Sequence, residues 1–182
     1  VYAEHNTVAT MMRQSHKGTV KITDSKGKSR SVLENVRFNS GDTVSTGKDC
    51  TASVALDSNK VVSMSENSTV EFKKQTNAIE LNMKEGEILF DVQRKLDPKE
   101  KLDVRTGAMS IDISGAIVAL EANAQAATIG SASKTESLKV LYGTAEAVCT
   151  DEAGIRRTVS VPAGQKFTIT DKDGDGSAGE IS

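Results

Sequence analysis

The last twelve residues, 171–182, form the one stretch whose residue types and spacing match a metal-binding pattern. Three carboxylates fall at ligand positions 1, 3 and 5 of an EF-hand-type loop: Asp171, Asp173 and Asp175. Gly176 lies at the turn position, but the twelfth position carries Ser182 where the pattern needs a bidentate Glu. An acid comes early instead, at Glu180. Two interpretations stay open: a shortened calcium loop, or an acidic C-terminal tail or linker that binds no metal.

The histidines, serines, threonines and carboxylates of this chain do not occur in the sequence patterns of known catalytic sites. The two histidines, His5 and His16, show no metal-ligand spacing and no link to a Ser or Cys elbow. Serines and threonines are abundant, yet no Gly-x-Ser-x-Gly motif and no phosphate-binding loop occurs. Most carboxylates stand in short polar segments such as "KEGE" and "DEAG", where solubility explains them. The sequence therefore predicts a protein that is not an enzyme and needs no cofactor, calcium excepted.

The two cysteines, Cys50 and Cys149, allow two interpretations. Free Cys behaves as a small hydrophobic residue, so both thiols can lie unbonded in the interior. A disulfide between two distant strands is the alternative, and it would place the protein in an oxidising compartment. Spacing in the sequence does not decide between the two.

Composition excludes several classes of partner. Basic and acidic residues nearly balance, at 23 against 25, whereas nucleic-acid-binding domains carry a basic surface. No apolar run approaches the roughly 20 residues of a membrane-spanning helix, so we expect no membrane insertion within these residues. The chain begins at Val1 without a signal peptide, which indicates a processed form or part of a longer protein.

Alternation of apolar and polar residues predicts an all-β fold. Short alternating stretches recur at roughly 8–12-residue intervals, each bounded by Gly-, Asp-, Asn- or Ser-containing turns. "SGDTVSTGKDCTASVAL", at 40–56, shows the pattern: two turns, then Ala52, Val54 and Leu56 at every second position. Strands of about five residues suit the rungs of a twisted β-solenoid. A two-sheet β-sandwich is the alternative architecture.

Two regions depart from this pattern. Residues 91–101 are charged and contain Pro98, which predicts an exposed connection between strands. Residues 116–137 are rich in Ala and Ser, and we expect a strand followed by a surface loop. Because they interrupt the scaffold, the loops at 91–101 and 122–137 are the candidate partner-binding segments.

The order of these elements resembles the FecR domain family. The matching segments are Gly18-Thr19-Val20, "GDTVSTG" at 41–47, "TASVALDS" at 51–58, "VVSMSENSTVEF" at 61–72, "IELNMKEGEILFDV" at 79–92, "LDVRTGAMSIDISGA" at 102–116, "LKVLYGTAEAV" at 138–148 and "VPAGQKFTI" at 161–169. The family usually has Gly-Thr-x-Phe where this chain has Gly-Ala-Ile-Val, at 115–118. The resemblance covers about residues 7–170, so we divide the chain into a FecR-like β domain, 1–170, and the tail 171–182.

The resemblance implies an extracytoplasmic domain of a bacterial surface or secreted protein, tethered to membrane or wall in the full-length form. In Gram-negative relatives this domain lies in the periplasm, between an anti-sigma region and a transporter contact. It implies a protein partner at the cell envelope and a role in protein–protein interaction or signal sensing. The alternative function is a structural or adhesive envelope module whose C-terminal linker calcium stiffens.

Overall fold

The computed structural model contains strands and no helix within the part of the chain that it describes. The described residues are 7–9, 11–13, 18–32, 36, 38–56, 60–75, 78–96, 101–123, 133–150, 154–172, 175–176 and 180–181. The prediction of an all-β fold is confirmed.

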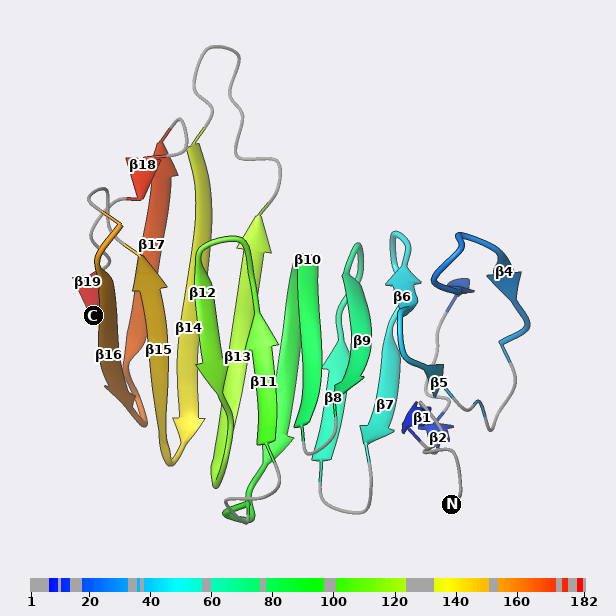
Figure 1. Cartoon of the computed structure of the whole chain (residues 1–182), viewed down its shortest axis with the longest axis horizontal. Helices are drawn as coiled ribbons and strands as arrows, with labels where there is room; N and C mark the ends of the chain where they lie inside the picture. The colour runs from blue at the N-terminus through cyan, green and yellow to red at the C-terminus, as the bar shows by residue number, and fades with distance from the viewer. Residues whose placement is uncertain are drawn as a thin grey trace.

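Nearly all strands lie in two layers that stack face to face (Figure 1). The first layer contains, in spatial order, β4 (Ser29–Arg30), β3 (Val20–Thr23), β6 (Asp42–Thr46), β9 (Thr69–Gln75), the first half of β10 (Ala78–Val92), β11 (Lys101–Arg105), β12 (Met109–Asp112), β15 (Thr144–Thr150) and β16 (Arg156–Pro162). The second layer contains β2 (Met11–Arg13), β7 (Ala52–Leu56), β8 (Lys60–Met64), the second half of β10, β13 (Ala116–Asn123), β14 (Ser133–Tyr142) and β17 (Lys166–Lys172), with β18 (Asp175–Gly176) and β19 (Glu180–Ile181) along β17. A separate pair joins β1 (Thr7–Ala9) to β5 (Phe38–Asn39).

Strand β10 belongs to both layers. Residues 78–85 pair with β9 and, in parallel, with β11, whereas residues 86–92 pair with β8 and β13. The layers are therefore parts of one large mixed sheet connected through β10. Among the described strands the pairings branch outward from β10 and never return to it, so the sheet stays open.

Each point at which the chain passes from one layer to the other carries a residue with positive φ, where the connecting residues are described. These residues are Asp49, Asn67, Gly86, Gly115, Gly143 and Gly164. Left-handed backbone reverses the chain within a few residues, and Gly, Asn and Asp tolerate it better than other residues. The repeating plan is a hairpin in one layer, a crossing, and a hairpin in the other.

The core lies between the layers. In β6 and β7 every second residue is buried, as the alternation predicts. All four phenylalanines are buried, and Phe38 stacks on Phe72 with ring centroids 5.0 Å apart. Small aliphatic side chains fill the rest of a single continuous core.

The two regions expected to be irregular are shorter than predicted. Strand β10 continues to Val92, and β11 already begins at Lys101. Leu96, inside the expected exposed connection, is buried, and its backbone N–H donates to Ser114 Oγ at 2.7 Å. The predicted strand from Ala116 is confirmed, but β14 starts at Ser133, within the expected loop. Strand pairing with β17 explains that difference, because it satisfies the backbone of this polar segment.

Candidate functional site

A row of four carboxylates crosses the outer face of the first layer. Glu80 lies opposite Asp103, Asp103 opposite Asp112, and Asp112 opposite Glu146. They come from four neighbouring strands, β10, β11, β12 and β15. Neighbouring strands lie about 4.8 Å apart, so the row extends over roughly 14 Å. Register alone therefore concentrates negative charge from residues far apart in the sequence.

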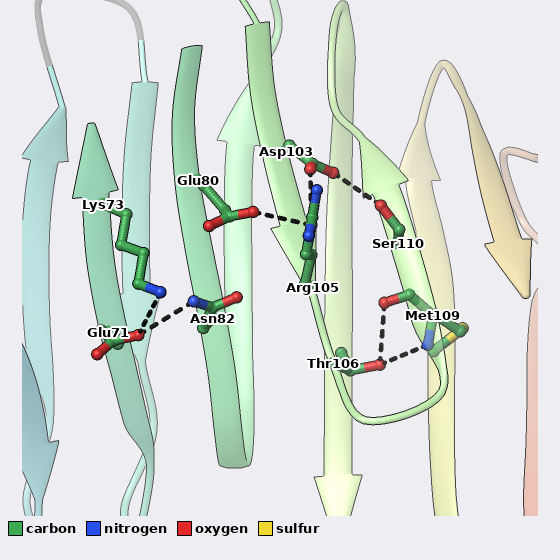
Figure 2. A network of polar contacts seen from close by, with 9 residues as sticks. All are labelled: Glu71, Lys73, Glu80, Asn82, Asp103, Arg105, Thr106, Met109 and Ser110. Carbon is green, nitrogen blue, oxygen red and sulfur yellow. Dashed lines mark hydrogen bonds and ion pairs between the residues drawn. The ribbon is translucent and has the colours of Figure 1, made fainter. Parts of the chain in front are cut away.

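Arg105 neutralises one end of this row (Figure 2). Its Nε lies 2.9 Å from Glu80 Oε1 and 3.1 Å from Asp103 Oδ2. The hydrogen bond that Arg105 donates to Asp103 and the charges of Glu80 and Asp103 raise the pKa of Arg105. The Ser110 hydroxyl also donates to Asp103 Oδ1, at 2.9 Å. Glu80 is only 6% exposed, so Arg105 pairs with a nearly buried carboxylate from its solvent side.

The other end of the row consists of Asp112 and Glu146. Partial burial, followed by the charge of Asp103, raises the pKa of Asp112, and Glu146 adds to the shift. Lys101 opposes the shift. Because Asp112 and Glu146 are exposed, this end of the row can bind cationic side chains from a partner.

A second polar group lies beside the row on β9 and β10 (Figure 2). Asn82 Nδ2 donates to Glu71 Oε1 at 3.1 Å, and Lys73 Nζ lies 3.6 Å from the same oxygen. Lys73 is largely exposed, so this contact adds little stability. Glu71, Asn82 and Lys73 thus extend the polar surface of the first layer beyond the acidic row.

Glu136 ties the two layers together below this face. It comes from β14, in the second layer, and is 8% exposed. Its Oε2 accepts hydrogen bonds from Thr106 Oγ1 and, at 3.1 Å, from the Ala108 N–H. Thr106 Oγ1 in turn accepts the Met109 N–H at 3.0 Å. These bonds fix the turn between β11 and β12, which positions the acidic row.

Sequence reasoning missed the row, because it assigned the carboxylates to turns. A usable signal was present: each of the four acids occupies an outward position in an alternating stretch, as in "IELNM" and "KLDVR". What the sequence lacked was the register that aligns them. No set of three or more metal-ligating side chains gathers within the described ranges.

The residues singled out in the sequence are scattered. Cys50 and Cys149 are free thiols. Cys50 is buried between β6 and β7, where its sulfur accepts the Thr19 N–H at 3.2 Å. Cys149 is half-buried on β15. His5 and His16 lie outside the described residues.

The predicted calcium ligands remain a prediction. Asp171 and Asp175 lie on the β17–β18 hairpin, where Asp171 pairs with Gly176 and Lys172 with Asp175. Asp173 lies outside the described residues, as do residues 97–100 and 124–132 of the predicted partner-binding loops.

Fold and surface together define an all-β domain whose two layers present outer faces of different chemistry. The chain belongs to the FecR family: the model described as FecR protein matches residues 42–146. The matched segment runs from β6 into β15 and includes the whole acidic row.

Two solved structures share this fold. Both are described as "a putative anti-sigma factor from Parabacteroides distasonis ATCC 8503", at 1.65 Å and 2.50 Å resolution. Each has a TM-score of 0.58 and 18% sequence identity to this chain, over 77% of its length. The chain spans 57% of the length of that protein. A search of curated proteins finds no match. Within the described ranges there is also no helix with the length and apolarity needed to cross a bilayer.

Proposed function

We propose that this chain is the non-enzymatic, extracytoplasmic domain of a bacterial signalling regulator and that it works by binding a protein partner. The observation that carries the proposal is the FecR match over residues 42–146. The matched residues run from β6 into β15 and so include strands of both layers. The similarity to the family therefore extends over most of the fold and is not limited to one short motif. The Parabacteroides protein of the same fold is described as "a putative anti-sigma factor", and this description also supports a role in signalling.

The geometry suits a binding role. One continuous core makes the sheet rigid, so its outer faces keep their charge pattern when a partner approaches. Electrostatic matching with such a face favours one partner over others and speeds association. Partner binding then shifts the balance between two states of the full-length protein, and the ligand's differential affinity sets the size of that shift.

Cross-linking on native cells tests this proposal. The tagged full-length protein is cross-linked at the surface of its own cells, and the captured molecules are identified by mass spectrometry. Capture of an envelope transporter or an anti-sigma component supports a signalling role. Capture of wall polymer or adhesion proteins alone contradicts it and favours the structural module with a calcium-stiffened linker.

A further inference from the structure

On the outer face of the second layer, one row of paired residues is apolar except for Asp91. Val61, on β8, lies opposite Asp91, on β10; Asp91 lies opposite Ile117, on β13; and Ile117 lies opposite Tyr142, on β14. Val61 is 38% exposed and Tyr142 is 54% exposed. Three of the four large exposed hydrophobic side chains in the described chain belong to this region: Val61, Leu141 and Tyr142.

A β-bulge contributes to this exposure. Ile117 pairs with Tyr142 and Val118 with Val140, so Leu141 is the extra residue on β14. A bulge re-aims side chains, and here two consecutive residues, Leu141 at 50% and Tyr142 at 54%, both reach solvent. Leu89 and Ala119, paired with each other in the adjacent row, continue the apolar surface as half-buried side chains. We call the six residues Val61, Leu89, Ile117, Ala119, Leu141 and Tyr142 the apolar face.

Carboxylates border the apolar face at two levels. Asp91 stands in the row itself, and its Oδ2 accepts a long, 3.5 Å hydrogen bond from Gln93 Nε2. Glu87 and Glu121 lie opposite each other, beyond Leu89 and Ala119, and both are exposed. Four residues along a strand span about 13 Å, which is the separation of Asp91 from Glu87. Two exposed cations lie on the β14–β17 side of this surface: Lys139, opposite Ala119, and Lys166, opposite Lys139.

We propose that the apolar face binds a basic amphipathic segment of a partner protein. Such a segment packs Leu-, Val- or aromatic side chains on Val61, Leu141 and Tyr142 and directs a Lys or Arg to Asp91. A second cation, roughly two helical turns away, meets Glu87 and Glu121. A second copy of this chain fits less well, because its own carboxylates Asp91, Glu87 and Glu121 would add to those of this surface and outnumber its two lysines, Lys139 and Lys166. This inference rests on the proposed protein-binding function.

Site-specific photo-cross-linking in the full-length protein tests the inference. A benzophenone amino acid replaces Leu141 in one variant and Ile155, a 61% exposed residue outside the apolar face, in the control. We expect a discrete protein adduct from position 141 and none from 155 on native cells. The cross-linked peptide of the partner should combine apolar residues with Lys or Arg.

Charge reversal makes the test specific. Asp91→Lys should lower the adduct yield from position 141 by roughly tenfold, because two cations would then face each other at a desolvated contact and weaken binding strongly. Glu66→Lys, the same reversal at an exposed carboxylate in the turn between β8 and β9, should leave the yield unchanged. Thermal melts show that both variants are folded.

Several results overturn the inference. They are an adduct with a second copy of this chain, a lipid adduct, a cross-linked peptide rich in acids, no discrete adduct from 141, or a yield unaffected by Asp91→Lys. If chemical cross-linking still captures a signalling partner, only the binding face is wrong. If neither method captures a protein, the proposed function fails as well.

Discussion

Gly86 lies directly against the backbone of Ser68: a Cβ built on Gly86 would come 2.5 Å from the Ser68 Cβ and closer still to its Cα. Gly86 has φ +105° and marks the point where β10 leaves the first layer for the second. Ser68 is fully buried there, and its hydroxyl accepts the Glu87 N–H at 3.1 Å. The crossing thus depends on a residue without a side chain.

Gly86→Ala should lower the free energy of unfolding by roughly 2–4 kcal/mol, since both the φ angle and the contact with Ser68 become strained. Gly27→Ala is the matched control, because Gly27 has φ +80° but no atom within 4 Å of an added Cβ. It should cost only about 1 kcal/mol. Urea denaturation measures both. Equal losses would mean that the approach of Ser68 is unimportant.

Removing Asp42 should destabilise the N-terminal end of the first layer. Asp42 is 1% exposed, pairs with Arg30, and accepts the Asn39 N–H at 2.7 Å. Asp42→Ala leaves that donor unsatisfied, and we expect a loss of about 3 kcal/mol in the free energy of unfolding. A double-mutant cycle with Arg30→Ala should give non-additive losses. Strict additivity would show that the pair is not coupled.

Glu136 provides a test of how the acidic row is held. Glu136→Ala should lower the free energy of unfolding by about 2–3 kcal/mol, because it removes a charged acceptor from the Thr106 hydroxyl and the Ala108 N–H. Glu136→Gln, which keeps an acceptor oxygen, should lose less. Hydrogen exchange should also speed up in the β11–β12 turn of Glu136→Ala. Unchanged exchange in that turn would contradict the role assigned to Glu136.

Asp112 should make stability fall as pH rises. Its pKa is raised above 3.8 in the folded state, chiefly by burial and then by Asp103, so the folded protein holds that proton more tightly than the unfolded chain does. Ionisation above this pH therefore disfavours the folded state. Asp112→Asn should be more stable than the parent near neutral pH, by about 0.5 kcal/mol or less given its exposure, and the difference should vanish in acid.

The measurement is urea unfolding of parent and Asp112→Asn between about pH 3 and pH 7, with Glu121→Gln as a control on the second layer. A variant that is less stable than the parent at neutral pH would show that Asp112 makes a favourable contact when ionised.

The sequence by itself determined the all-β class, most strand positions and the membership of the core. Alternation at period two is local, and it appears wherever one side of a strand faces an interior, as in Ala52, Val54 and Leu56. The order of the elements was also enough to indicate FecR, which the family match confirms.

Only the tertiary structure decided how the strands combine. "KEGE", at 84–87, is typical of a hairpin turn, yet β10 runs through it and changes layer at Gly86. A glycine with positive φ suits either a hairpin turn or a crossing between layers. Which of the two forms depends on which distant strands are available to pair with the residues on each side. The same holds for the two outer faces. Glu80 and Glu146 share a row, and Val61 and Tyr142 share another, because inter-strand register joins residues that lie far apart in the chain.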